Sequence, residues 1–167
     1  MTDTGVVALR ELEDADLDAM FDQMRDPEAV RMAAFTTKDP EDRAAFDAHM
    51  RTVRTSPQIL HRSVTLDGEF VGSIASFVIE GDTEITYWLD REYWGRGIAS
   101  RALELLLQLE PTRPIYARAA SDNRGSLRVL AKAGFVPIGT DVGFANARGE
   151  KIEETILRLG EPGQTAH

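Results

Sequence analysis

The residues best suited to chemistry in this sequence surround two closely spaced glycines, in Trp94-Gly95-Arg96-Gly97-Ile98-Ala99. The segment joins a strand-like aromatic stretch to a leucine-rich stretch with helical periodicity. The first turn of a helix has backbone N–H groups without intrahelical partners, at the positive end of the helix dipole. Glycine lets an anion approach these groups, and Arg96 can add charged hydrogen bonds. The junction predicts a site for an anion such as a phosphate, or else a tight turn that binds nothing.

The glycine junction does not identify the anion by itself. No Gly-Lys-Ser or Gly-Lys-Thr follows it, so it is not a Walker loop. Gly95, Gly97 and Ser100 do not complete the dinucleotide fingerprint, and they follow expected antiparallel hairpins instead of opening a βαβ unit. Both observations weaken an assignment as a nucleotide-phosphate enzyme.

Charge is distributed unevenly along the chain. The formal net charge of −9 argues against nucleic acid as a partner, because phosphate binding needs a concentration of Lys and Arg. Residues 91–132, however, contain eight basic and four acidic side chains, a balance of +4, so the remainder carries −13. This partition favours one anionic ligand bound locally and a cationic partner on the acidic surround, although basic side chains on solvated helix faces would give the same balance.

Composition excludes several chemistries and bounds the domain organisation. The 167 residues are 43% apolar, which suits one globular domain; we expect it to span residues 1–160, with residues 161–167 as a disordered tail. The chain has no cysteine and its three histidines lack metal-ligand spacing, so we expect no metal and no cysteine nucleophile. No stretch is apolar enough for a membrane span and the N-terminus is unlike a signal peptide, which predicts a cytoplasmic protein without membrane contact.

The first third of the chain is expected to be mainly helical. Apolar residues recur at helical spacing from residue 17 to residue 24, and Asp14 or Asp16 is the expected cap of this helix. A short helix is expected after Asp26-Pro27, and Asp39-Pro40 predicts the start of a third helix, with an aspartate cap and proline at the first helical position.

The remainder is expected to be rich in strands. Asp67-Gly68 predicts a two-residue hairpin turn with positive φ at both positions, and Gly81-Asp82 predicts a second turn. Helices are expected at residues 98–109 and 123–133, the latter closed by Gly134. The expected strands lie at residues 6–10, 63–66, 69–79, 84–89, 115–119, 136–144 and 152–159.

A second motif, SDNRGSLRVLAKAGFVPIG at residues 121–139, specifies the ligand. It has the form Asn-x-x-Ser-x-x-(apolar)-(apolar)-x-Lys-x-Gly-Phe, and residues 94–99 match [Gln/Arg]-x-x-Gly-x-[Gly/Ala] except for Trp at the first place. Together the two motifs resemble the GNAT superfamily of acyl-CoA-dependent N-acyltransferases, and are most similar to the branch that includes ribosomal-protein-alanine acetyltransferases. The order of elements over residues 6–159 agrees with this family.

The resemblance implies an α+β fold with a mixed, mostly antiparallel sheet of about seven strands and about four helices. It also implies acetyl-CoA as co-substrate, with its pantetheine arm in a gap where the fourth strand splays from the fifth. Arg96, Arg101, Arg124 and Arg128 are candidates for its phosphates. The implied CoA-binding residues are Tyr87, Trp88, Leu89, Gly95, Arg96, Gly97, Ile98, Ala99, Ser100, Asn123 and Ser126.

Catalytic residues are less well specified by the motifs. Many relatives use a tyrosine five residues before the Gly-Phe phenylalanine, where this chain has Leu130. This departure shifts attention to Ser126 as the acid that protonates the leaving thiolate, although a serine near a helix start is also a routine capping residue. Glu84 is the candidate base for the amine, or a solvated strand residue; Glu80 and His61 are weaker candidates.

The resemblance implies direct transfer of an acetyl group to a primary amine in a ternary complex. A protein N-terminus or a small cationic amine is the expected acceptor, and a homodimer is one expectation because dimers are common among relatives. The alternative is a module that binds or senses acyl-CoA without turnover, which the missing tyrosine leaves open.

Overall fold

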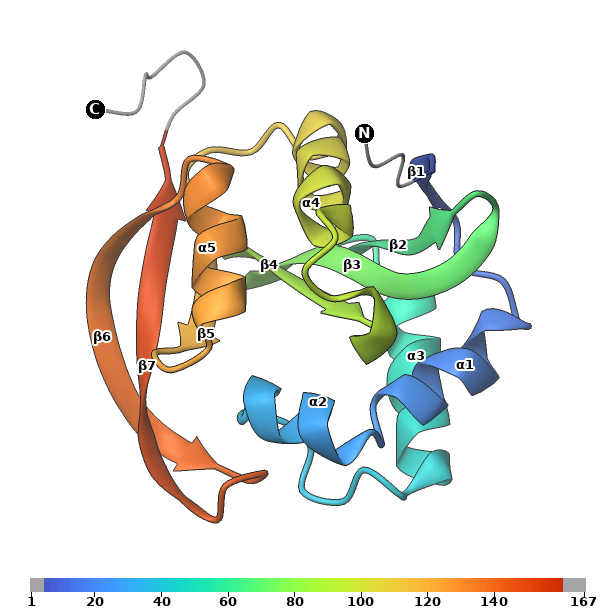
Figure 1. Cartoon of the computed structure of the whole chain (residues 1–167), viewed down its shortest axis with the longest axis horizontal. Coiled ribbons are helices and arrows are strands. Elements are labelled where there is room, and N and C mark those ends of the chain that lie inside the picture. The colour runs from blue at the N-terminus through green and yellow to red at the C-terminus, as the bar shows by residue number, and fades with distance from the viewer. Residues whose placement is uncertain (1–4, 161–167) are drawn as a thin grey trace.

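Within residues 5–160, which this computed structural model describes, seven strands form one mixed sheet with helices on both faces (Figure 1). The expected tail at residues 161–167 lies outside the described residues. The strand order across the sheet is β1-β2-β3-β4-β5-β7-β6. The strands are Val7–Arg10 (β1), Leu60–Leu66 (β2), Glu69–Ile79 (β3), Asp82–Leu89 (β4), Ile115–Ala120 (β5), Val136–Ala145 (β6) and Glu150–Leu159 (β7).

The sheet opens between β4 and β5, as the sequence predicted. These two strands form the parallel pair of the sheet, and their pairing covers Thr83–Ile85 against Ile115–Ala117. The second half of β4, residues 86–89, continues beside β3 and leaves β5. A parallel sheet needs a crossover connection, and α4 supplies it here. A gap bordered by the end of β4 therefore forms in the middle of the sheet.

The helices divide between the two faces of the sheet. Helices α4 and α5 pack on the main core, where Ile98, Leu103, Leu106 and Leu130 are almost fully buried. Helices α1 and α3 pack on the other face around Met20 and Met50. None of the helices described between residues 5 and 160 is long and apolar enough to cross a bilayer. The helices are Asp16–Gln23 (α1), Pro27–Ala33 (α2), Arg43–Thr55 (α3), Ile98–Leu109 (α4) and Arg124–Lys132 (α5), with a short 3₁₀ helix at Arg91–Tyr93.

One of the two predicted hairpin turns is confirmed and the other is displaced by one residue. Asp67 and Gly68 have φ values of 51° and 88°, as a turn with two left-handed central residues requires. The next turn has its positive φ angles at Glu80 and Gly81, while Asp82 is already the first residue of β4. The prediction of Gly81-Asp82 was wrong by one residue, because Glu80 adopts a left-handed conformation and forms the turn with Gly81.

The predicted caps of α1 and α3 were also wrong. Helix α1 has Ala15 at its N-cap, and neither Asp14 nor Asp16 caps it. Asp16 is instead buried and accepts hydrogen bonds from Arg10 and Ser63. Helix α3 begins at Arg43, and Asp42 accepts from the Ala45 N–H; Asp39-Pro40 forms a turn before the helix.

Candidate active site

A cavity of about 390 Å³ opens at the gap between β4 and β5, and we call it the splay cavity. It combines the end of β4, the glycine junction, the start of α5 and one side of α2. Nine of the eleven residues predicted to bind the co-substrate line it: Tyr87, Trp88, Leu89, Gly95, Gly97, Ala99, Ser100, Asn123 and Ser126.

The other two predicted residues do not line the splay cavity. Arg96 is exposed, and its guanidinium lies 5.3 Å from the ring centroid of Tyr93. Ile98 is 1% exposed and packs into the main core, where it anchors the first turn of α4. Alternate residues of the loop point in opposite directions, so the two glycines face the cavity and the arginine between them does not.

The glycine junction presents an uncapped helix N-terminus to the splay cavity. Gly95 and Gly97 have φ values of 74° and 81°, a conformation that residues with a Cβ rarely adopt. A Cβ added at either position would meet no atom within 4 Å, so the space beside the backbone is open. Gly97 is the N-cap of α4 and no side chain caps it. The first N–H groups of α4 are therefore available to an anion.

Trp94 explains the departure from the family pattern at the first place of this motif. Its indole Nε1–H donates to the Leu89 carbonyl oxygen at 2.9 Å. This bond ties the loop back to the last residue of β4 and fixes the distance between the strand end and the helix start. The tryptophan has a structural partner here, whereas the sequence showed only a mismatch.

The end of β4 exposes backbone hydrogen-bonding groups to the gap. Asp90 N–H donates to Val71 O, and Leu89 lies opposite Gly72, which makes Leu89 and Gly72 a non-hydrogen-bonded pair. Because such pairs alternate, the N–H and C=O groups of Tyr87 and Leu89 point away from β3, toward the space that β5 has left. The Leu89 C=O is occupied by Trp94 Nε1–H, and an extended ligand lying in the gap can pair with the other three groups as a strand would.

Two cations on α5 border the splay cavity. Arg128 and Lys132 are four residues apart on one helical face, and both line the cavity. Neither forms an ion pair with a carboxylate among residues 5–160, whereas Arg101 pairs with Glu104. Arg128 was a predicted phosphate contact, but Lys132 was predicted only as part of the second motif. Its spacing from Arg128 is the signal that could have identified it.

Ser126 and Tyr87 bring two hydroxyl groups together in the lining of the splay cavity. Ser126 Oγ lies 2.8 Å from the Tyr87 hydroxyl oxygen. Asn123 caps α5, and its Oδ1 accepts a hydrogen bond from Ser126 N–H at 3.2 Å. Burial raises the pKa of Tyr87, although the hydrogen bond with Ser126 opposes the shift. Tyr87 therefore remains protonated and can pass a proton to Ser126.

Glu84, the predicted base, lies away from this hydroxyl pair. Adjacent residues of a strand point to opposite faces, so Glu84 shares its face with Trp88 and not with Tyr87. Its carboxylate is 3.8 Å from Arg118 Nε, and it lines neither of the two cavities. Burial raises the pKa of Glu84, while Arg118 lowers it.

A second cavity, of about 470 Å³, lies on the opposite face of β4, and we call it the helix cavity. It is enclosed by α1, α3 and the faces of β2, β3 and β4, and it shares Tyr87 and Trp88 with the splay cavity. His61, a weak candidate from the sequence, lines it. Burial lowers the pKa of His61 to about 4, and Arg62, His49 and Arg54 add to the shift. His61 is therefore neutral at physiological pH.

Leu130 occupies the position where many relatives have a tyrosine. It is 1% exposed and belongs to the main hydrophobic core, below the surface of the splay cavity. At this place on α5 the chain therefore has a side chain packed in the core, and no hydroxyl group. The Tyr87 hydroxyl reaches the cavity from β4 instead.

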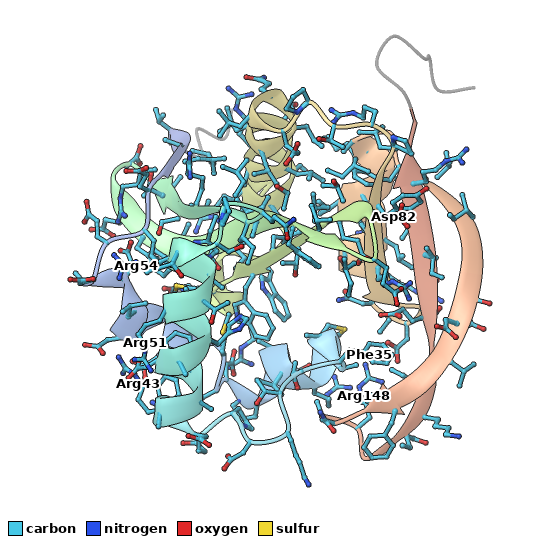
Figure 2. All side chains as sticks on the ribbon, turned by 180° about the vertical axis from the view of Figure 1, so that it is seen from behind. Phe35, Arg43, Arg51, Arg54, Asp82 and Arg148 are labelled. Carbon is cyan, nitrogen blue, oxygen red and sulfur yellow. The ribbon has the colours of Figure 1, made fainter. Side chains whose placement is uncertain are left out.

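Helix α2 contributes a wall that the sequence did not predict. Ala29, Met32 and Ala33 line the splay cavity. The C-terminal end of α2 is held by the β6–β7 turn: Arg148 Nε donates to Arg31 O at 2.6 Å, and Ala147 N–H donates to O of the C-cap residue Ala34. Figure 2 shows Arg148 beside Phe35 where this turn meets the α2–α3 connection.

Comparison with known proteins gives consistent matches. A family model described as an acetyltransferase (GNAT) domain matches residues 7–136, more than half of the chain. An uncharacterized N-acetyltransferase p20 of Bacillus licheniformis is 26% identical, with 93% of each chain covered.

Two solved structures illustrate the structural similarity. Mycobacterium smegmatis RimJ, in complex with CoA-disulfide, has a TM-score of 0.82 and 25% identity, over 98% of this chain and 87% of that one. Spermidine N-acetyltransferase from Vibrio cholerae, in complex with CoA and spermine, has a TM-score of 0.79 at 17% identity, over 93% of this chain and 95% of that one.

Proposed function

Because the chain belongs to the GNAT acetyltransferase family, as its two motifs predicted, we propose that it transfers the acetyl group of acetyl-CoA directly to a primary amine. The observation that carries this proposal is the splay cavity, where an uncapped helix N-terminus, a free strand edge and the cations Arg128 and Lys132 meet. Each of the three features matches a different part of one ligand.

The splay cavity has the groups that CoA requires. The exposed backbone of Tyr87 and Leu89 offers pairing to the amide groups of the pantetheine arm. The open glycine backbone and the start of α4 suit the pyrophosphate. Arg128 and Lys132 supply positive charge for a further phosphate. The similar RimJ structure, which is a complex with CoA-disulfide, supports this choice of ligand.

Acetyl transfer makes three demands on the protein. The amine nitrogen bonds to the thioester carbonyl carbon while the carbon–sulfur bond breaks, the amine loses a proton and the thiolate gains one. We assign the thiolate's proton to Ser126, which the Tyr87 hydroxyl can resupply across 2.8 Å. The Leu89 N–H, turned toward the gap, is the proposed donor to the developing oxyanion. Glu84 is kept as the proposed base; because it lines neither cavity, it would act on the amine through a chain of water molecules.

The relatives suggest the range of acceptors. The Vibrio cholerae neighbour is named for spermidine and its structure contains spermine, so a small amine is one class of acceptor. A protein N-terminus is the other class that we propose, from the second motif. Nucleic acid is not proposed, since the chain carries a net charge of −9.

The proposed function is tested by measuring binding and turnover separately. Acetyl-CoA should raise the melting temperature more than ATP or NAD does, because a ligand that binds only the folded state stabilises it. Release of free CoA thiol should then depend on an added amine. Tight binding of acetyl-CoA without thiol release for any amine would instead support the binding module, and stronger stabilisation by ATP or NAD would contradict the proposed ligand.

A further inference from the structure

The helix cavity has an unusual lining for a protein whose charge outside residues 91–132 is −13. Its described lining residues include no Asp, Glu, Lys or Arg. Most are apolar or aromatic, including Tyr87 with its hydroxyl group, and the others are two histidines, two serines, one threonine and one amide. The lining comprises Met20, Met24, His49, Met50, Val53, Ser56, Gln58, Ile59, His61, Ser73, Ile74, Ala75, Phe77, Val78, Thr86, Tyr87 and Trp88.

The position of the helix cavity suits it to bind the acceptor. It shares Tyr87 and Trp88 with the splay cavity, and these residues belong to the part of β4 that has left β5. A molecule in the helix cavity can therefore meet one in the splay cavity at this part of the strand. The volume of about 470 Å³ falls within the range of small-molecule sites.

His61 lies at the far end of the helix cavity from the shared residues. It is paired across the sheet with Ala75, and Ala75 is paired with Thr86, so the three side chains share one face. Two strand spacings separate His61 from β4, a span of about 10 Å. His61 Nδ1 is buried and has no hydrogen-bond partner among residues 5–160. A buried Nδ1 cannot be reached from the cavity, so the Nε2 edge of the imidazole is the part that can bind the opposite end of the acceptor; it is too far away to touch the reacting amine.

An uncharged lining also selects the protonation state in which the amine binds. A charged ammonium is costly to bury without a carboxylate, so the cavity favours the neutral amine, whose lone pair is free to attack. A polyamine would carry its further charges into the same uncharged space. The aromatic rings of Phe77 and Trp88 suit a flat apolar body instead.

We infer that the acceptor is a primary amine on an uncharged aromatic or alkyl body, with a hydroxyl group at its distal end that hydrogen-bonds to His61. This inference rests on the proposed function, because it assumes that acetyl transfer takes place at the shared residues. It replaces the expected cationic acceptor with an amphipathic monoamine. A hydroxyl can donate or accept, so it suits either tautomer of the imidazole. The low pKa of His61 supports this role, since burial and the neighbouring Arg62, His49 and Arg54 keep it neutral although Asp16 opposes them.

The inference is tested with three amines and one substitution. Thiol release from acetyl-CoA is measured with tyramine, with phenethylamine, which lacks the hydroxyl, and with spermidine. We expect kcat/KM for tyramine to exceed that for spermidine by at least about tenfold. The His61→Leu variant should lower kcat/KM about tenfold more for tyramine than for phenethylamine, because only tyramine loses a hydrogen bond.

Other outcomes separate this inference from the proposed function. A preference for spermidine or for an N-terminal peptide, with thiol released, would overturn the inference and leave acetyl transfer intact. An equal loss for tyramine and phenethylamine in His61→Leu, or no loss for either, would overturn the contact with the hydroxyl. If His61→Leu folds poorly, the wild-type preference for tyramine over phenethylamine, and the stabilisation of the CoA-bound protein by tyramine over spermidine, test the same inference. Failure of every amine, with acetyl-CoA bound, would contradict the proposed function itself.

Discussion

Ser126 and Tyr87 are 39 positions apart in the chain, and their hydroxyl groups meet because α5 packs over the end of β4. The sequence identified both residues, Ser126 from the second motif and Tyr87 as part of the strand edge. It could not identify their contact, because no spacing rule joins a strand residue to a residue of a helix after the next strand. Long-range contacts of this kind are the part of the candidate site that motifs leave out.

The hydroxyl pair gives a prediction for catalysis. Ser126→Ala should lower kcat by about 10- to 100-fold, since it removes the proposed proton donor, and Tyr87→Phe should lower it less. KM for acetyl-CoA should change little. Thiol-release kinetics measure both constants. Ser121→Ala is a matched control, because Ser121 shares a hydroxyl pair with Thr155 at 2.7 Å outside both cavities. A kcat in Ser126→Ala equal to that of the wild type would mean that Ser126 packs in the site and donates no proton.

The cations of α5 give a prediction for ligand binding. Arg128→Ala and Lys132→Ala should each raise KM for acetyl-CoA by about tenfold at low salt, with kcat nearly unchanged, because the phosphates lie far from the acyl carbon. The effect should shrink as salt screens the charges. Arg96→Ala should have a smaller effect, since Arg96 is exposed and does not line the splay cavity.

Arg101→Ala is the control for these variants. Arg101 lies on α4 near the same site but is paired with Glu104, so KM should remain that of the wild type. An unchanged KM in both α5 variants would mean that the positive balance of residues 91–132 serves solubility and not ligand binding.

At the scale of elements, Asp16 joins β1, α1 and β2. Its carboxylate accepts hydrogen bonds from Arg10 at 2.7 and 2.9 Å, from Glu13 N–H, and from Ser63 Oγ at 2.8 Å. Burial alone would raise the pKa of Asp16, but these hydrogen bonds outweigh it and lower the pKa to about 2. The sequence suggested a helix cap because aspartate is common there, and a cap is the usual reason for aspartate before a helix. The buried pair depends on three elements and could not be predicted locally.

Asp16 therefore gives a prediction for stability against pH. The pKa falls on folding from 3.8 to about 2, so the stabilisation is complete above about pH 4 and is lost as pH falls toward 2. Its magnitude is about 2 kcal/mol. Asp16→Asn should lower the free energy of unfolding at pH 7 by about that amount and flatten its dependence between pH 4 and 2, as urea unfolding at several pH values would measure. Asp14→Asn, at an exposed ion pair with Arg54, is the control and should leave the dependence intact.

Element types were easier to predict than element limits. Alternation and turn chemistry located the strands, and Gly97 and Gly134, with φ of 81° and 105°, begin or end helices where the motifs predicted. The errors lie at Asp39, Asp16 and Gly81, where several polar residues compete for one local role. Which aspartate caps a helix depends on where tertiary packing places the helix start, and that information is not local.

At the scale of the whole molecule, the β6–β7 turn is bonded to segments beside the site. Arg148 in its turn donates to both Asp122 carboxylate oxygens, at 2.8 and 3.1 Å, and to Arg31 O. Asn146 Nδ2 also donates to Thr36 O at 2.8 Å. Two segments that border the splay cavity, the end of α2 and the start of α5, are thus joined to the hairpin turn by one side chain.

This arrangement predicts a coupled loss of order in Arg148→Ala. Amide hydrogen exchange should rise in residues 31–36 and 145–149 and stay unchanged in β2 and β3, because only the contacts of the turn are removed. KM for acetyl-CoA should rise about two- to fivefold as α2 loosens beside the cavity. The free energy of a lost hydrogen bond to a charged group is large enough for a change of this size. Arg31→Ala, which removes an exposed pair with Glu28, is the control. A uniform rise in exchange would mean general destabilisation instead.

The family and the sheet with its opening could be predicted from two motifs and the order of elements. The helix cavity could not, because its walls come from α1, α3 and three strands, none of which carries a motif. The overall charge of the chain pointed to a cationic acceptor. The charge of the helix cavity differs from this average because the acidic side chains lie elsewhere, and the cationic acceptor stays a prediction; Asp14 and Asp18, for example, pair with Arg54 and Arg43 of α3, both labelled in Figure 2.

The two cavities that meet at Tyr87 and Trp88 bear on the order of events in a catalytic cycle. Each lies on its own face of β4, so neither substrate has to pass the site of the other. For the proposed acetyl transfer, this arrangement predicts that acetyl-CoA and the amine can arrive in either order and that the two products can depart independently. In steady-state terms we expect a random sequential mechanism, in which free CoA competes with acetyl-CoA but not with the amine.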